Sequence, residues 1–477
     1  MATYILNENI ALRSWQLVPY AYYIYGVREA KGLTREQFHL LLQCDGEQEL
    51  EDSPLLRQFE RAGLCRQSKD GDALTDWQKH RSYENRYFPH LNWAITGKCN
   101  FNCLHCFMAA DNAPMMEEFT WEQCLSLLDE CVRCGVQTIT LTGGEPMLHP
   151  RFMDIVRECA KRRLCISEVN TNGSFITAEV LDEWKALGMD ILVKISYDGL
   201  GHHDWLRNVA GAEEKAMRAI RLCKERGFRV RAQTNVHRGN LGVMFDTVKL
   251  LDAMGVEEVR IIRTTETPRW NKNGRDMCLG LQEYYDEMLG LIERLVREKL
   301  SIQVDVWQFA YYFPASKTYY FHPVQAQCGQ YRDSIPLCRG ARGTIAVAHT
   351  GELSPCNQMA GTLAKMGIML GNVKKHPLHE LLIEGSYLDT VTMPVSAVKE
   401  KNPECQNCQY WSACMGGCRA IAIALTKDLL HADPSKCLFF KGGYMKKIDD
   451  AFAAADPEYR CGDNVGDMAR KGELQRQ

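Results

Sequence analysis

The sequence predicts an α/β protein built on a partial barrel of six strand–helix units, with a winged-helix-like module before it and a cysteine-rich domain after it. Two observations predict this arrangement. Between about Leu91 and Arg263, short apolar runs alternate with longer amphipathic segments, which is typical of parallel strands joined by crossover helices. The chain of 477 residues also carries 21 cysteines, many of them in spaced clusters.

Residues 1–85 form the predicted winged-helix-like module. Their aromatic opening suits short strands, and Thr34 is a suitable N-cap for a helix through Phe38. A second short helix is expected around residues 55–59 and ends near Gly63. Strands and short helices in this order fit a winged helix.

The barrel is predicted for residues 88–265. Six units are too few for a complete eight-stranded barrel, so we expect an open barrel with its chemistry at the C-terminal ends of the strands. The expected strands are residues 92–96, 136–141, 166–170, 191–196, 230–236 and 259–262. The remaining domains are a bridging region with a helix from Leu281 to Lys299 (266–337), the cysteine-rich domain (338–440) and a C-terminal helix and tail (441–477).

The composition is that of an ordinary soluble globular protein, with 45% hydrophobic residues, 25% charged residues and a formal net charge of −3. This balance gives no global reason to expect nucleic acid or an anionic membrane as a partner. No apolar stretch approaches the roughly 20 residues of a spanning helix, and the start lacks the layout of a signal peptide. We therefore expect a cytoplasmic protein.

Clustered cysteines in a reducing compartment indicate metal binding rather than disulfides. Nine others stand singly in apolar surroundings and are expected to be small buried hydrophobic residues. These nine are Cys44, Cys65, Cys124, Cys131, Cys134, Cys159, Cys165, Cys223 and Cys278.

Directly after the first predicted strand come Cys99, Cys103 and Cys106, spaced C-x3-C-x2-C. Three thiolates leave one iron of a 4Fe–4S cube without a protein ligand, so that iron can bind and reduce a small molecule. A zinc site with His105 as fourth ligand is the alternative. His105 lies between two cysteines in the sequence, however, where its ring is expected to point away from the metal. The loop resembles the signature of the radical S-adenosylmethionine (SAM) superfamily, which implies that His105 lies beside the adenine.

Further motifs end the following strands. Gly143 and Gly144 let the backbone approach a ligand closely, and the Glu145 carboxylate can accept from an ammonium group. This run is similar to the family's motif for the methionyl amino group. Positions at the ends of the third and fourth strands are further candidates for cofactor contact, with turn chemistry as the alternative. Two polar positions on the fifth strand could face the barrel lumen and contact the cofactor, with a water network as the alternative. Together these positions are Asn172, Ser196, Asp198, Gln233 and Asn235.

The resemblance also implies how the reaction opens. One electron enters the cluster held by the three catalytic cysteines, the S–C5′ bond of SAM breaks, and a 5′-deoxyadenosyl radical abstracts hydrogen from an inert C–H bond. The protein orients cofactor and substrate and excludes competing hydrogen donors. An external one-electron donor such as flavodoxin or ferredoxin is then needed.

The second cysteine set resembles a complete SPASM domain, which implies two auxiliary 4Fe–4S clusters and three clusters in all. By this resemblance the first auxiliary cluster is bound by Cys338, Cys356 and Cys418, and the second by Cys405, Cys408, Cys414 and Cys437. Cys328 is the candidate for the missing fourth ligand; without it, an open iron could hold a substrate thiolate. A pair of structural zinc ribbons is the alternative.

The N-terminal module resembles the leader-recognition element of enzymes that modify ribosomally made peptides, and such modules add the leader to a sheet edge as a strand. A plain cap on the barrel is the alternative. We therefore predict a peptide maturase that installs a crosslink, with a cysteine thioether as first choice. Carbon–carbon crosslinking, epimerisation, a non-peptide substrate and a redox scaffold remain open.

Two single positions bear on the reaction. Asn357 stands where the sulfatase-maturing branch of the family has an aspartate, which disfavours formylglycine formation. Cys461 lies in a polar tail, where it is either incidental or the hydrogen-atom donor that an epimerase needs.

Overall fold

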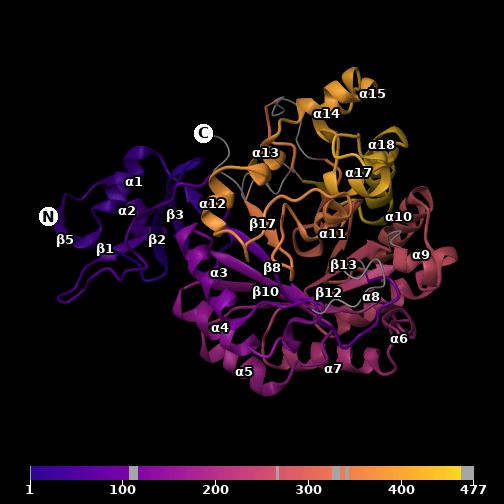
Figure 1. Ribbon diagram of the computed structural model, residues 1–477, viewed down its shortest axis with the longest axis horizontal. Coiled ribbons are helices and arrows are strands. Elements are labelled where there is room, and N and C mark those ends of the chain that lie inside the picture. Colours follow the sequence, from indigo (N-terminus) through magenta and orange to yellow (C-terminus); the bar gives the residue numbers. More distant parts are fainter. Residues whose placement is uncertain (1, 107–116, 265–267, 325–333, 339–342, 463–477) are drawn as a thin grey trace.

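The computed structural model describes residues 2–106, 117–264, 268–324, 334–338 and 343–462. A twelve-stranded sheet forms its centre, and two small sheets make up the N-terminal module. Figure 1 shows the module at the left of the view, the barrel helices along the lower side, and the cysteine-rich part at the upper right.

Parallel strands form the middle of the large sheet. All six expected strands are present, and a seventh, β14, continues the parallel order. They are β8 (His90–Thr96), β9 (Thr138–Gly143), β10 (Cys165–Thr171), β11 (Leu192–Ser196), β12 (Val230–Val236), β13 (Glu258–Arg263) and β14 (Gln303–Val306). Over the residues that the structure describes, the sheet does not close on itself, so the expected partial barrel is confirmed.

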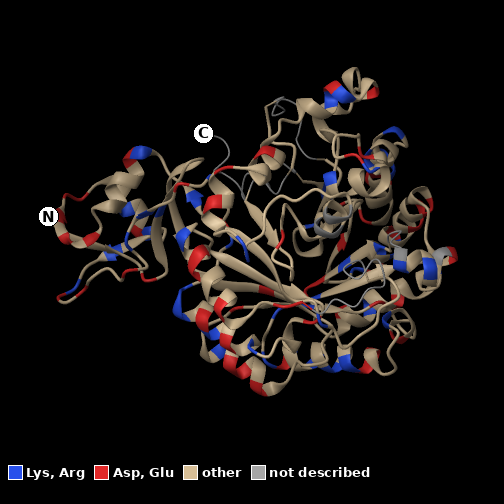
Figure 2. Ribbon diagram, in the orientation of Figure 1, with Lys and Arg blue, Asp and Glu red and all other residues tan. Residues whose placement is uncertain are grey.

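Crossover helices cover one side of this sheet (Figure 1). They are α3 (Trp121–Arg133), α4 (Phe152–Lys161), α5 (Ala178–Ala186), α7 (Ala212–Glu225), α8 (Met244–Ala253) and α10 (Leu281–Glu298). Threonine caps start two of them, because the Thr120 and Thr177 side chains accept from backbone N–H groups of the first turn. Buried Trp93, Ile139 and Trp184 belong to the core between helices and sheet, and Figure 2 shows charged residues along the outer faces of α4, α5 and α7.

The sheet extends further than the sequence predicts. On one side, the hairpin of β15 (Ala310–Phe313) and β16 (Thr318–Phe321) follows β14, and β19 (Arg460–Cys461) pairs with β16. On the other side, β17 (Thr344–Val347) pairs in parallel with β8 and carries β18 (Leu353–Ser354). The segment interpreted as a bridge therefore supplies sheet strands, which were missed because each has only four residues.

The cysteine-rich part is a set of short helices. Most have four to nine residues, too few to show a helical period in the sequence. They are α11 (Asn357–Lys365), α12 (Leu378–Ile383), α13 (Ser386–Thr392), α14 (Ser396–Lys401), α15 (Pro403–Gln406), α16 (Trp411–Cys414), α17 (Arg419–Thr426) and α18 (Pro434–Lys441), and α19 (Tyr444–Ala455) follows. A small core around Val398 and Trp411 supports part of this region.

The N-terminal module contains both predicted helices. These are α1 (Arg35–Leu42), which starts at the Thr34 capping box, and α2 (Pro54–Arg61). One sheet has the order β5-β1-β6 and the other β4-β3-β2-β7. The strands are β1 (Ala2–Leu6), β2 (Ile10–Trp15), β3 (Val18–Ile24), β4 (Lys31–Gly32), β5 (Asp45–Leu50), β6 (Cys65–Gln67) and β7 (Arg81–Ser82).

The module rests against the end of the barrel where the strands begin. Arg163, just before β10, places its guanidinium 4.3 Å from the ring centre of Tyr25 and 4.8 Å from that of Trp77. Gly135, just before β9, leaves no room for a side chain because Trp15 and Tyr83 lie against it. Both loops precede strands, so the module lies at the end opposite the predicted chemistry.

A layer of alternating charges, which we call the charged layer, crosses the neighbouring strands β10 to β14. Glu168 pairs with Lys194 at 2.5 Å, and Arg231 reaches both Glu168, at 3.8 Å, and Glu258, at 2.6 Å. Arg260 continues the chain of ion pairs to the next carboxylate, Asp305, at 2.6 Å. These side chains are largely shielded from solvent, so each depends on its neighbours for compensation.

Cysteine burial follows the expectation. Eight of the nine single cysteines are buried, and Cys278 is half-buried.

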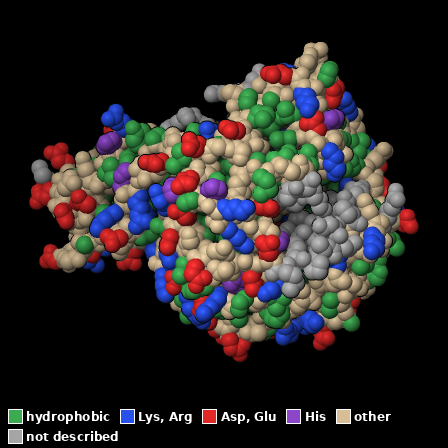
Figure 3. Space-filling model, viewed as in Figure 1, with side chains coloured by type: hydrophobic (Ala, Val, Ile, Leu, Met, Phe, Trp, Pro, Cys, Tyr) green, Lys and Arg blue, Asp and Glu red, His purple; other side chains and the backbone are tan. Residues whose placement is uncertain are grey.

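None of the helices in the described ranges combines the length and apolarity that crossing a bilayer requires. On the face shown in Figure 3, positive and negative side chains are interspersed.

Candidate radical SAM site

The cysteine loop leaves the C-terminal end of β8. Its backbone is anchored to the segment after β11, because the Leu104 N–H donates to the Leu206 carbonyl at 2.9 Å. The Phe101 N–H donates to the Cys99 sulfur at 3.4 Å. The structure thus brings Cys99, Cys103 and Cys106 together on one short turn, as the sequence predicts; their binding of a cluster stays a prediction.

Gly143, the last residue of β9, and Gly144 make room for this loop. A side chain at Gly144 would overlap the carbonyl oxygens of Gly97 and Lys98, and Gly143 has a φ of +149° that disfavours other residues. The Glu145 N–H also donates to the Lys98 carbonyl at 2.8 Å. In the structure these glycines admit the backbone of the cysteine loop. Their contact with a ligand stays a prediction.

Glu145 is fully buried behind this contact. Its carboxylate accepts from the Thr171 hydroxyl at 2.9 Å and from the backbone N–H groups of Asn172, at 2.8 Å, and Met147, at 3.3 Å. Burial raises the pKa of Glu145 to about 7 despite these bonds. Within the described residues no cationic side chain pairs with it, so the site fits the ammonium group of SAM.

The other predicted contact residues, at or near the ends of the third to fifth strands, have different partners in the structure. The Asn172 amide donates to the Asn100 side-chain oxygen in the cysteine loop at 2.8 Å. Ser196 and Gln233 are half-buried partners across β11 and β12. Asn235 is turned toward Asp198, since its amide lies 3.4 Å from that carboxylate.

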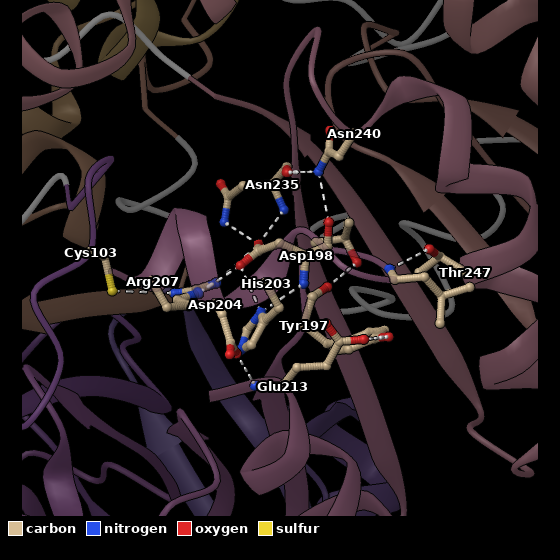
Figure 4. A network of polar contacts seen from close by, with 12 residues as sticks. Cys103, Tyr197, Asp198, His203, Asp204, Arg207, Glu213, Asn235, Asn240 and Thr247 are labelled. Carbon is tan, nitrogen blue, oxygen red and sulfur yellow. Dashed lines mark hydrogen bonds and ion pairs between the residues drawn. The ribbon is translucent and has the colours of Figure 1, made fainter. Parts of the chain in front are cut away.

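Asp198 is held by groups of the protein, and its contact with the cofactor stays a prediction. Figure 4 shows its carboxylate engaged by Arg207 and His203, which belong to helix α6 (His203–Arg207), and by the backbone N–H of Asn235. Although burial alone would raise it, Arg207 and His203 hold the pKa of Asp198 well below its usual range. Its carboxylate is therefore occupied by groups of the protein itself.

His105 retains an unused polar atom. Its Nδ1 is buried and finds no hydrogen-bond partner within the described part of the chain. Burial, with a smaller effect from Arg207, lowers the pKa of His105 to about 3, so the ring is neutral. A neutral ring with a free nitrogen fits contact with a polar ligand.

Four cysteines of the second set share one hollow. Cys405, Cys408, Cys414 and Cys437 line one hollow together with Trp411. The grouping matches the predicted second auxiliary cluster, although they lie up to 32 residues apart in the sequence. Their role as ligands stays a prediction.

The other cysteines of this set lie around Cys356. Burial raises the pKa of Cys356 to about 12, and the nearby thiols of Cys338 and Cys418 contribute. Cys328 lies outside the described residues. Cys461 is exposed on the edge strand β19, beside Tyr319.

Among the described residues, no three His, Cys, Asp or Glu side chains converge as ligands of a single metal ion. The thiolates of a 4Fe–4S cube bind different irons, so they need not converge in this way.

Sequence reasoning missed Arg207. Its side chain is buried and lies 3.8 Å from the Cys103 sulfur. Nothing in the sequence distinguishes this arginine from a solvated one on a short helix. Its importance follows only from the folded arrangement.

Comparison with known proteins finds two matching families, one over the barrel and one over part of the cysteine-rich domain. Residues 93–251 match the radical SAM superfamily, and residues 338–409 match the SPASM iron–sulfur cluster-binding domain. AdoMet-dependent heme synthase from Methanosarcina barkeri is 25% identical over 74% of this chain and 97% of its own length. PqqA peptide cyclase from Granulibacter bethesdensis is 24% identical over 76% of this chain and 91% of its own.

A solved structure shares the fold more widely. Streptococcus suis SuiB, bound to its precursor peptide SuiA, aligns with a TM-score of 0.63 over 91% of this chain and 100% of its own, at 14% sequence identity. At that identity the likeness is one of fold.

The fold and these matches define an iron–sulfur enzyme. The chain carries a radical SAM domain followed by a SPASM domain. Its cofactors are accordingly a 4Fe–4S cluster with SAM in the barrel and auxiliary iron–sulfur clusters in the SPASM domain. The buried Glu145, the neutral His105 and the cysteine hollow fit these groups.

Proposed function

We propose that this enzyme is a peptide maturase that abstracts hydrogen from a ribosomally synthesised precursor and installs a crosslink, with a cysteine thioether as the first candidate. One observation carries the proposal: SuiB, solved with its precursor peptide, has a similar fold over 91% of this chain. Residues 86–477 alone cannot account for that coverage, so part of the N-terminal module takes part in the match.

The module has the features that strand addition requires. In the sheet β5-β1-β6, both outer strands pair on one side only within the described residues. Their outer N–H and C=O groups can pair with an extended peptide, so that affinity comes from the main chain and specificity from side-chain pockets. Leader binding by residues 1–85 is therefore part of the proposal.

The proposed roles in the barrel follow from the site. The cluster is held by Cys99, Cys103 and Cys106, and Glu145 holds the ammonium group of SAM. When bound, the reduced cluster and SAM supply a 5′-deoxyadenosyl radical. We further propose a cytoplasmic location and an external one-electron donor such as flavodoxin or ferredoxin.

The test is anaerobic turnover with a short peptide encoded beside the gene, followed by mass spectrometry in heavy water. A crosslink removes two hydrogens and accompanies 5′-deoxyadenosine formation, whereas epimerisation leaves the composition unchanged and adds one solvent deuteron. A Cys99→Ala, Cys103→Ala, Cys106→Ala variant is the matched control and forms neither product. SAM cleavage without any change in the peptide contradicts the proposal.

Leader binding is tested separately by hydrogen exchange on the full chain. We expect the leader segment alone to slow exchange in β5 or β6, because a new strand would pair with their outer groups. Unchanged exchange throughout residues 2–67 favours the alternative that the module only caps the barrel.

A second candidate is an enzyme of tetrapyrrole metabolism. Heme synthases match this chain over nearly their whole length, as the Methanosarcina barkeri protein does. In this case an iron porphyrin, and not the peptide, changes mass in the same assay. The two candidates are thus distinguished by which substrate is consumed.

A further inference from the structure

Arg207 lies between a predicted cluster ligand and a buried carboxylate. Its Nε and Nη2 donate to the two oxygens of Asp198 at 2.6 and 3.0 Å, and its Nη1 lies 3.8 Å from the Cys103 sulfur. Figure 4 shows the guanidinium extending from α6 between these two groups. One edge of the planar guanidinium thus binds the Asp198 carboxylate, and the remaining nitrogen is directed toward the Cys103 sulfur.

The carboxylate that orients Arg207 is held from three directions. It also contacts the His203 ring nitrogen at 3.0 Å and accepts from the Asn235 backbone N–H at 2.9 Å. The Asn240 amide fixes the Asp198 carbonyl at 2.7 Å. Because Asp198 is fully buried, withdrawal of Arg207 would leave an uncompensated charge, so the guanidinium stays in place.

We propose that Arg207 raises the reduction potential of the SAM-binding cluster by donating a charged hydrogen bond to the Cys103 thiolate, with Asp198 as the residue that positions it. Reduction adds one negative charge to the cluster, and a cationic donor on a ligand sulfur stabilises the more negative state. The inference concerns electron entry and holds whichever substrate the enzyme uses.

The main alternative is a structural role, in which the Asp198–Arg207 pair only fixes α6 against β11 and β12. Both roles predict damage when Arg207 is removed. They differ in the sign of the effect at Asp198. For an electrostatic role, loss of the cation and loss of its counter-anion shift the potential in opposite directions.

The experiment is a redox titration of the reconstituted full-length enzyme, following the electron paramagnetic resonance signal that changes on SAM addition. Arg207→Met should favour the oxidised cluster by at least tenfold, which corresponds to a fall of about 59 mV for a one-electron couple. Asp198→Asn should shift the same potential upward, because the amide oxygen still accepts from Arg207 and keeps it in place while the negative charge is removed. Arg226→Met is the matched control, since Arg226 pairs with Asp182 at the surface, 3.1 Å away, and should leave the potential unchanged.

Iron and sulfide content is measured for every variant. If Arg207→Met does not retain the cluster, Arg207→Lys is titrated instead and should show a smaller fall, because a lysine keeps the charge but not the fork. Unchanged potentials in cluster-loaded Arg207 and Asp198 variants, or shifts of the same sign in both, overturn the proposal.

Discussion

The backbone N–H of Asn172 donates to the Glu145 carboxylate at 2.8 Å, which ties the C-terminal end of β10 to that of β9. The neighbouring Thr171 hydroxyl donates to the same carboxylate at 2.9 Å. The carboxylate is therefore oriented before any ligand arrives, although burial keeps its pKa at about 7. A ligand cation would complete this arrangement and lower that pKa.

SAM affinity should therefore depend on pH near neutrality. An ammonium group binds the ionised carboxylate, so binding below about pH 7 releases a proton from Glu145. We expect affinity to fall roughly sixfold between pH 7.5 and pH 6, because protonation of Glu145 outweighs the fuller protonation of the SAM amino group. Isothermal titration calorimetry in buffers of different ionisation enthalpy measures both the affinity and the proton release.

The matched variant for this prediction is Glu145→Gln. It should bind SAM weakly, and its affinity should not fall as the pH is lowered from 7.5 to 6. The ligand's own amino group, with a pKa of about 8, should limit binding on the alkaline side in both proteins. An affinity for the unaltered protein that does not change between pH 6 and 7.5 would contradict the role of this carboxylate.

Gly144→Ala should disturb the cysteine loop. The added methyl group meets the backbone carbonyls of Gly97 and Lys98, which cannot move without displacing the loop. We expect a loss of about 2 kcal/mol in stability and a reduced content of the SAM-binding cluster. Gly242→Ala is the control, because nothing lies within 4 Å of that position, and it should shift the melting temperature little.

Cys437→Ser should remove one auxiliary cluster and spare the others. Cys437 shares its hollow with Cys405, Cys408 and Cys414, so the loss should amount to roughly four irons per chain. Iron analysis and Mössbauer spectroscopy measure it. Cys461→Ser, on the exposed edge strand, should lose none; equal loss in both variants would be inconsistent with the assignment.

Glu168→Gln should destabilise the barrel through the charged layer. The change leaves Lys194 and Arg231 without the carboxylate they share, at a cost of about 3 kcal/mol. The double variant Glu168→Gln, Lys194→Met should recover part of this loss in thermal unfolding. A double variant as unstable as the sum of the two single changes would show that the ion pair contributes nothing.

Acid should weaken the same layer in the unaltered protein. Burial opposes ionisation of Glu168, but Lys194 and Arg231 outweigh it and hold its pKa well below the ordinary value of 4.5. The stabilisation is thus present above about pH 4.5 and is lost as the pH falls further. Glu168→Gln should show a smaller loss of melting temperature on acidification.

Much of the barrel could be predicted from the sequence because its strands are apolar runs separated by long amphipathic helices. The six strands and the helix beginning at Leu281 lie close to the expected positions. The short strands β14 to β17 could not be predicted from the sequence, because a four-residue run of Tyr, Phe or Val has no distinctive context. Their pairing depends on neighbours distant in the chain, as β17 and β8 show.

The candidate site also has a part that the sequence predicts and a part that it does not. Cysteine spacing gives the ligand sets, since each group of thiols must fall within reach of one cluster. Partners assembled by folding carry no such spacing: Arg207 reaches Cys103 across 104 residues of sequence. The sequence likewise could not reveal that Arg207 and His203 contact the Asp198 carboxylate.

The N-terminal module packs against Gly135 and Arg163. This position sets a minimum length for any substrate that the module holds. The radical site lies at the other end of strands such as β8, which has seven residues and so spans about 23 Å. A peptide anchored at the module must pass along the barrel before its reacting residue arrives. Substrates would therefore need a spacer of at least about seven extended residues, and shortening that spacer should abolish modification while anchoring persists.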